Sequence, residues 1–368
     1  MNQVMHYLDG VIDTRQQAKV KHLMKDIIAI VFIASLANAT EWMEIYYFAT
    51  SKEEELSKYL ELPNGIPSHD TIQRVFAMVS PEYLQGFQKS WNEEISSNEG
   101  EKLKRILAID GKTQRGNATA DQKGNHIISI VDENGFCLGQ ERVNEKTNEI
   151  TAIPGLLDNM NIKGHIITTD AMGCQTEIVK KIRQKQADYV LALKGNQGSL
   201  HDDVKQYFND PDLLKGCAYS KTLEKARSSI EKREYWQTDD ISWLTQKKDW
   251  AGLKTIAMTK NTITKDKKTT TEVRYFISSL PLEVKEVARA IRSHWMVESY
   301  HWHLDVTFRE DANHTLDKHA AFNLNIVKKI ALNILKLLDV GLKRVSLKGK
   351  RYMISMNVEK YLAQLLAL

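Results

Sequence analysis

Short apolar runs after residue 104 constrain the fold most, because each is only as long as a β-strand. They occur at 105–109, 126–131, 136–143, 165–169 and 189–193. Asn134 and Gly135 form a typical hairpin turn between the second and third runs. Helical patterns separate the later runs, and strands that alternate with helices usually pair in parallel. The pattern therefore predicts an α/β protein whose mixed sheet is flanked by helices.

The rest of the chain divides by its hydrophobic pattern. We predict a helical N-terminal domain at 1–98, the first part of the α/β core at 104–215, a β-rich insertion at 216–280 and a helical remainder of the core at 281–368. The N-terminal part contains one long apolar helix pattern over 25–49 and a charged helix pattern over 52–62. Turn residues then lead to Ser68, a predicted N-cap. This outline fits either a DNA-binding helix-turn-helix or an ordinary structural helix pair.

Composition excludes several classes of protein. Hydrophobic residues make up 42% and charged residues 27%, which is typical of a globular chain. Lys and Arg total 51 and Asp and Glu total 47, so the net charge of +4 does not itself indicate nucleic acid. Three distant cysteines form no disulfide framework or zinc ribbon, and indicate reduced thiols in a cytosolic protein. The longest apolar run, 27–37, is shorter than a membrane span and predicts a buried helix rather than an export signal.

Two carboxylates stand at the ends of predicted strands. Asp110 follows the first strand and Asp170 follows the fourth. Side chains at strand ends are held by a rigid sheet while the loops beyond them stay free, so ligands gather there. Each acid is therefore a candidate metal ligand. The alternative is that Asp110 belongs to a simple turn and that Asp170 is only a cap.

A third carboxylate, Glu298, lies within a helix predicted over 283–303. It falls inside an apolar arc formed by Val284, Val287, Ala288, Ile291, Trp295 and Trp302. His294 and His301, at i−4 and i+3, share its side of the helix. An acid on an apolar stripe is costly to bury unless it is paired or binds a cation. We therefore expect Glu298 and both imidazoles to point toward the core.

Three acids on three elements suit Mg²⁺ or Mn²⁺ with oxygen ligands. Two such ions, about 3.5–4 Å apart, activate a water or a 3′-hydroxyl and stabilise the leaving oxygen of a phosphodiester. One alternative is a zinc site on His294, Glu298 and His301, although the metalloprotease spacing is absent. The other alternative is purely structural, with Glu298 paired to Arg292 or to the histidines.

Basic residues lie where loops should meet the acids. Lys112 and Arg115 follow Asp110, and Lys194 and Asn196 follow the fifth strand. The C-terminal region adds eight basic residues against the single acid Asp339: Lys328, Lys329, Lys336, Lys343, Arg344, Lys348, Lys350 and Arg351. These residues predict contacts with the phosphates of DNA. The alternative for the C-terminal group is a solvated helix face.

Several motifs resemble one family of transposases. The run Arg292–Asp311 resembles the C-terminal signature of ISAs1-type transposases, which are related to the IS4 group and include H-repeat proteins. Ala108–Thr113 resembles the first catalytic motif of that family, and Ile167–Ala171 resembles the second. Tyr189–Gln197 is similar to the strand and loop that follow, and Leu62–Thr71 to the associated N-terminal region. The motifs occur in order and span nearly the whole chain.

The resemblance implies a ribonuclease-H-like core in which Asp110, Asp170 and Glu298 form a DDE triad. It also implies Mg²⁺-dependent nicking of double-stranded DNA at element ends and strand transfer into target DNA. The wider IS4 signature, Tyr-x2-Arg-x3-Glu-x6-Lys, is not kept, because Ile291, His294 and Asp305 occupy its Tyr, Arg and Lys positions. Arg292, His294 or His301 would then contact phosphate instead.

The family resemblance further implies a dimer or larger synaptic complex, because two DNA ends are handled together. It implies a bacterial cytoplasmic protein that associates with the nucleoid, without a membrane partner. Two other functions stay open from the sequence. One is a catalytically inactive, domesticated DNA-binding protein. The other is a metal-dependent nuclease that cuts DNA without joining it.

Overall fold

A computed structural model describes residues 3–98, 105–144, 148–225, 228–266 and 268–367. The predicted boundary between 98 and 104 lies outside these residues. The first segment is helical, with α1 Gln3–Asp9, α2 Met24–Leu36, α3 Trp42–Ser51, α4 Glu53–Leu56, α5 His69–Phe76 and α6 Pro81–Asn98. Ser68 caps α5 as predicted, because its side chain accepts from the Thr71 N–H.

The single helix predicted over 25–49 is wrong, because the chain breaks between α2 and α3. Asn38 adopts a left-handed backbone conformation with φ of 74°. The guanidinium of Arg351 binds the carbonyls of Ser35 and Ala39 that the broken helix leaves free. The charged helix predicted over 52–62 is also too long, since only α4 forms there. Apolar composition alone does not reveal such a break.

One nine-stranded sheet runs through the molecule in the order β3-β2-β1-β4-β5-β9-β8-β7-β6. Its strands are β1 Ile106–Thr113, β2 His126–Asp132, β3 Cys137–Arg142, β4 Ile166–Thr169, β5 Asp188–Leu193, β6 Ala218–Lys225, β7 Ser229–Thr238, β8 Thr255–Lys265 and β9 Lys268–Ser278. Strands β1, β2 and β3 are antiparallel, whereas β1, β4 and β5 are parallel. The predicted mixed sheet is confirmed.

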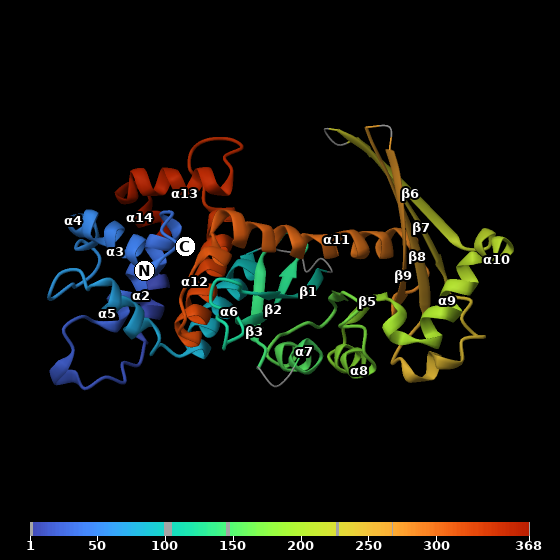
Figure 1. Cartoon of the computed structure of the whole chain (residues 1–368), viewed down its shortest axis with the longest axis horizontal. Helices are drawn as coiled ribbons and strands as arrows, with labels where there is room; N and C mark the ends of the chain where they lie inside the picture. The colour runs from blue at the N-terminus through green and yellow to red at the C-terminus, as the bar shows by residue number, and fades with distance from the viewer. Residues whose placement is uncertain (1–2, 99–104, 145–147, 226–227, 267, 368) are drawn as a thin grey trace.

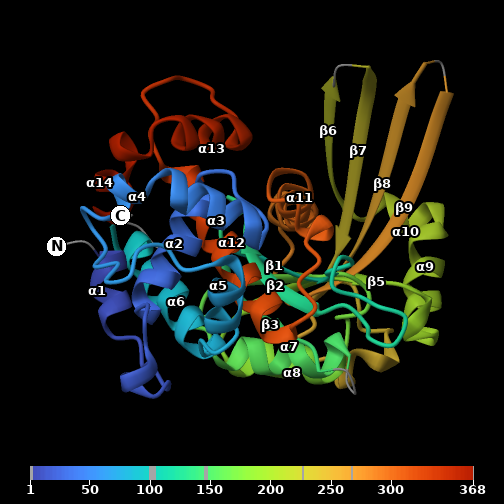
Figure 2. The same cartoon turned by 60° about the vertical axis from the view of Figure 1, so that its left-hand side comes forward.

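The β-rich segment 216–280 continues this sheet. Strand β9 pairs antiparallel with β5, and β8, β7 and β6 follow outward. The outer ends of β6, β7, β8 and β9 extend beyond the helices that pack on the sheet (Figures 1 and 2). The apolar residues of these strands lie at the inner ends, next to the rest of the sheet. Phe276 and Ile277 of β9 are buried there, whereas Thr269–Glu272 at the outer end of β9 are exposed.

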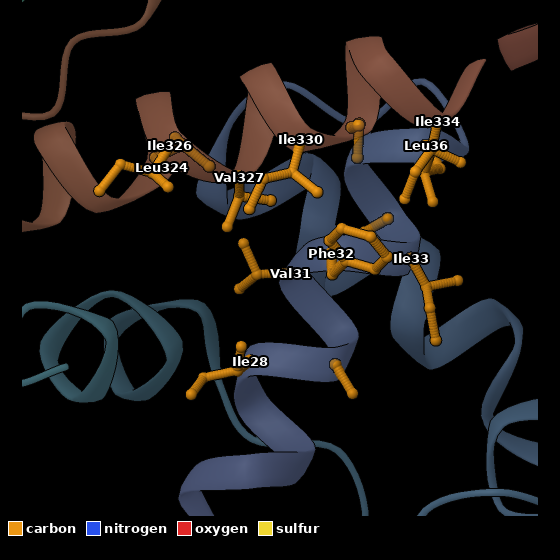
Figure 3. Close-up of a cluster of buried hydrophobic side chains, with 14 of the residues drawn as sticks. Ile28, Val31, Phe32, Ile33, Leu36, Leu324, Ile326, Val327, Ile330 and Ile334 are labelled. Atoms are coloured by element: carbon orange, nitrogen blue, oxygen red, sulfur yellow. The ribbon is translucent and has the colours of Figure 1, made fainter. Parts of the chain in front are cut away.

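Helices cover both faces of the sheet. One face packs against α7 Glu149–Asp158, α8 Thr176–Gln184, α9 Ser199–Asn209 and α10 Pro211–Lys215, and the other face meets α11 Val284–Trp302 and α12 Lys318–Leu337. The chain ends with α13 Leu347–Met356 and α14 Val358–Ala367. Figure 3 shows Val31 and Phe32 of α2 facing Val327 and Ile330 of α12. This contact joins the N-terminal helices to the rest of the core.

Much of the predicted C-terminal basic stripe is inside the protein. Lys328, Lys329 and Arg351 are at most 1% exposed. Lys350 donates to the carbonyls of Leu335 and Leu338, at 2.7 and 2.6 Å. The stripe prediction is therefore wrong for Lys328, Lys329 and Arg351, which are buried instead of facing solvent, and for Lys350, whose ammonium group binds backbone carbonyls. Of the eight residues, Lys343, Arg344 and Lys348 are exposed.

Candidate functional site

Strand register brings the first two acids together. Asp110 lies within β1, which continues to Thr113, so the predicted end of the strand at Ile109 is wrong, and so is the alternative that Asp110 belongs to a simple turn. Asp170 directly follows β4, as expected. Ile109 of β1 pairs with Thr169 of β4 in parallel register. Asp110 and Asp170 are the next residues along these two neighbouring strands, and they lie side by side.

Helix α11 crosses the same strands and carries the third acid. His294 Nδ1 lies 3.1 Å from Thr168 Oγ1 of β4, and His301 Nδ1 lies 3.5 Å from Asp110 Oδ2 of β1. Glu298 stands between these two histidines at helical spacing, on the side of α11 that they share. The helix therefore places Glu298 above the strand pair that holds Asp110 and Asp170.

Glu298 is exposed, so the expectation that it points into the core is wrong. The buried residues of α11 are Val287, Ala290, Ile291, Val297 and Tyr300, whereas Trp302, assigned to the apolar arc, is 56% exposed. The helix packs on the sheet along one side only. The apolar arc predicted from the sequence therefore includes residues, such as Trp302, that face solvent. Among the described residues, no ion pair joins Glu298 to Arg292, His294 or His301.

The charges of these acids act on one another. Burial is the main cause that raises the pKa of Asp110 to about 7; the carboxylates of Asp170, Glu149 and Glu298 contribute in the same direction, and the hydrogen bond from the Gly111 N–H acts against them. Asp170 Oδ1 accepts from the backbone N–H groups of Met172 and Gly173, at 2.9 and 3.2 Å. Such a set of carboxylate oxygens suits a hard divalent cation. Within the described ranges, however, no three His, Cys, Asp or Glu side chains close around a metal position.

The two histidines lie inside this site as neutral groups. Burial lowers the pKa of His294 to about 4 and that of His301 to about 3, and the charge of Lys329 also lowers the latter. A neutral imidazole brings no positive charge to a phosphate. Arg292, by contrast, is exposed on α11.

Lys112, predicted to contact phosphate, is surrounded by acids. Its Nζ lies 2.7 Å from Asp305 Oδ1, 3.2 Å from Glu310 Oε2 and 3.0 Å from Asp311 Oδ1. Asp305 is the residue at the Lys position of the wider signature. No local pattern indicated Glu310 and Asp311 as partners of Lys112, because they lie about 200 positions away in the chain.

The other predicted phosphate contacts lie on loops near the acids. The Arg115 side chain is 85% exposed, with Nε 3.9 Å from Asp311 Oδ2. Lys194 is exposed after β5. Asn196 Nδ2 donates to the Ala171 carbonyl at 2.8 Å, which ties the loop after β5 to the loop after Asp170.

A fourth carboxylate, Glu149, was missed. Its Oε1 lies 2.6 Å from His126 Nε2, and a Cβ added at position 111 would overlap this carboxylate. Gly111 is therefore required by the approach of Glu149 on the face of β1 opposite Asp110. The sequence signal that could have located Glu149 is the capping box of Asn148 and Thr151. This capping box sets the start of α7, and Glu149 is the first residue of that helix.

Comparison with known families identifies the class of protein to which this fold and these candidate site residues belong. Residues 101–334 match the model "Transposase DDE domain", and residues 5–92 match the model "DDE_Tnp_1-associated". The chain belongs to the DDE transposase family.

Several relatives of this chain have names that contain the word transposase. "Putative transposase YncI" of Escherichia coli O157:H7 is 38% identical over 99% of this chain and 94% of its own length. "H repeat-associated putative transposase YhhI" of Escherichia coli K12 is 36% identical over 100% of this chain and 98% of its own length. "Inactive transposase YbfQ" of the same strain is 35% identical over 20% of this chain and 89% of its own length. No helix in the described part of the chain has the length and apolarity to cross a bilayer.

Proposed function

We propose that this transposase cuts DNA at element ends and joins the cut ends to target DNA. The observation that carries the proposal is the placement of its three acids: Asp110 and Asp170 on neighbouring parallel strands, with Glu298 on the helix that contacts both strands. In the first step a water oxygen bonds to a backbone phosphorus, and the 3′ oxygen leaves as a hydroxyl. In the second step that 3′ oxygen bonds to a target phosphorus and displaces the target's own 3′ oxygen.

The sheet supports a ribonuclease-H-like core. Three antiparallel strands followed by two parallel ones, in the order β3-β2-β1-β4-β5, form its first part within 104–215. Segment 216–280 extends that sheet, and 281–368 supplies α11 and the remaining helices. The helices of 1–98 form the proposed DNA-binding domain.

Asp110, Asp170 and Glu298 would hold two Mg²⁺ ions, or Mn²⁺ in their place. When bound, these ions activate the attacking oxygen and stabilise the leaving one. The protein's own groups orient the site: His294 and His301 hold α11 on the strands, and Asn196 holds the loop beside Asp170. Arg115, Lys194 and Arg292 extend from the neighbouring surface and are proposed to bind phosphates.

Two element ends must be held together during transfer, so we propose that the working form is a dimer or larger complex. It would act on double-stranded DNA in the bacterial cytoplasm, at the nucleoid. The absence of membrane partners is part of the same proposal.

Glu298→Gln tests the mechanism. The probe is a duplex made from the DNA that flanks each end of the gene, and nicking is measured with Mg²⁺. We expect a loss greater than about 10²-fold, because a metal ligand is removed. Glu283→Gln, an exposed acid just before α11, is the matched control and keeps wild-type nicking.

Unchanged nicking by Glu298→Gln would remove Glu298 from the mechanism. Cutting without joining by the wild-type protein would identify a nuclease, since a strand-transfer assay detects only joined products. Specific binding of the end without any cutting would identify an inactive DNA-binding protein.

A further inference from the structure

Lys112 occupies a distinctive place two residues after Asp110. Side chains alternate along a strand, so Lys112 and Asp110 share one face of β1. The Lys112 side chain is only 12% exposed, and its Nζ contacts Asp305, Glu310 and Asp311. Its charge is therefore engaged within the protein rather than presented to solvent.

Its three acidic partners all follow Glu298 along the chain. Asp305 lies in a π-helix, His303–Thr307, that directly continues α11, and Glu310 and Asp311 begin a 3₁₀ helix at Glu310–Ala312. π-helical turns are rare and often occur at functional sites. One ammonium group thus links the strand of Asp110 to the segment that leaves the helix of Glu298.

The segment is fixed from the other side as well. Glu310 is 2% exposed and accepts hydrogen bonds from Asn325 of α12 and, at 3.3 Å, from Gln114. Burial of this carboxylate requires neighbouring cations. Lys112, Lys328 and Lys329 all lower its pKa by their positive charge.

We propose that Lys112 is a positioning residue for the metal site: its ion pairs with Asp305, Glu310 and Asp311 hold Asp110 in register with Glu298. This inference rests on the proposed function, because it gives Lys112 a task only if these acids bind metal. Groups that orient metal ligands from outside typically change metal affinity by 10–100-fold when they are removed. A lysine that contacts phosphate would behave differently, because its loss weakens DNA binding uniformly and reduces the salt slope by about 1.

The experiment compares Lys112→Met, Lys112→Arg and the double variant Lys112→Met/Asp305→Asn. The double variant tests whether misfolding explains the result. Without the Lys112 ammonium group, Asp305 would lose its ion-pair partner, so the double variant removes that carboxylate as well. Glu310 still has the positive charges of Lys328 and Lys329 nearby. Lys181→Met is the matched control, because Lys181 of α8 pairs with Asp158 at 2.6 Å outside the site. The full-length protein is titrated with Mg²⁺ alone, and thermal unfolding reports binding because a bound ion stabilises the folded state.

We expect Lys112→Met and the double variant to need roughly tenfold more Mg²⁺ for the same stabilisation. Lys112→Arg recovers part of the affinity, and Lys181→Met matches the wild type. The affinity for a duplex DNA probe and its salt slope, measured in chelator, stay unchanged in all four variants.

Equal Mg²⁺ titrations for wild type and Lys112→Met, or a salt slope reduced by about 1 in that variant, would overturn the positioning role. If the wild-type protein itself shows no stabilisation by Mg²⁺, the metal site of the proposed function fails instead. The two failures are therefore distinguishable.

Discussion

His294 of α11 and Thr168 of β4 form a hydrogen-bonded contact of 3.1 Å between the helix that carries Glu298 and the strand that precedes Asp170. His294 is neutral at physiological pH because burial lowers its pKa to about 4. The contact is thus a hydrogen bond between uncharged groups. The contribution of this hydrogen bond can be measured as a change in the free energy of unfolding.

Replacing Thr168 with Val removes this hydrogen bond and leaves His294 Nδ1 without its partner. We expect the free energy of unfolding to fall by about 1–3 kcal/mol, the usual cost of an unsatisfied buried polar group. Urea denaturation measures the change. Thr222→Val, at an exposed position of β6, is the control and should change stability by less than about 0.5 kcal/mol. Equal effects of the two substitutions would show that the contact contributes nothing.

Replacing Asp110 with Asn should stabilise the metal-free protein at alkaline pH. The pKa of Asp110 is about 7 in the folded protein, against 3.8 for the free group, chiefly because of burial. The folded wild type therefore holds a proton that the unfolded chain lacks between these values, and its stability falls as pH rises through 7. Asn carries no charge and escapes that loss, which amounts to roughly 4 kcal/mol at most.

The measurement is urea denaturation of both proteins in chelator across this pH range. The advantage of Asp110→Asn should be largest above pH about 7 and disappear near pH about 4. Comparison at each pH cancels the contributions of groups that do not contact position 110, including His294, whose lowered pKa acts in the opposite direction. A variant less stable than wild type at pH about 8 would contradict the burial of a charged Asp110.

Gly111→Ala should destabilise the protein, because the added methyl group clashes with side chains on the face of β1 opposite Asp110. The added methyl group overlaps the Glu149 carboxylate and the His126 ring, so both must move. We expect a loss of about 1–3 kcal/mol, as for other overpacked sites. Adding Glu149→Ala removes the obstacle and should recover part of the loss, which thermal unfolding would show. A Gly111→Ala protein as stable as wild type would rule out the close packing.

Arg351→Met tests the buried cation that closes the break between α2 and α3. Arg351 is 0% exposed and donates to the carbonyls of Ser35, Ala39 and Thr307. Three acceptors lose their donors, so we expect a loss of about 3 kcal/mol or more. Arg351→Lys should recover little, because an ammonium group lacks the planar fork of donors. Arg344→Met, at an exposed position, is the control in the same urea titration.

Much of the sheet was predictable because several strands have a recognisable local sequence pattern. The runs at 126–131 and 165–169 each hold several β-branched residues and end at turn residues, and they become β2 and β4 with shifts of about one residue. Asp110 and Asp170 were found for the same reason, since an acid after an apolar strand is conspicuous. The true end of β1 was not predictable, because Asp110–Thr113 is polar and is held in the sheet by pairing with β2.

The errors concern contacts between distant segments. Lys328 and Arg351 look like solvent-facing charges in sequence, and their partners, Glu310 and the carbonyl of Ser35, are set only by packing of α12 and α13. Glu298 was expected to be buried but is exposed, because the apolar residues of α11 face two different surroundings, the sheet and solvent. Local periodicity does not distinguish an apolar residue that packs from one that stays exposed.

Because β6–β9 lie between β5 and α11 in the chain, Glu298 is synthesised only after the whole nine-stranded sheet. On the proposed mechanism, a gene copy interrupted upstream of that codon encodes strands without their third acid. A copy that starts downstream of Asp170 encodes a helix with no strand pair to rest upon. On that mechanism, a truncated copy of either kind lacks part of the acidic triad and would neither cut nor join DNA.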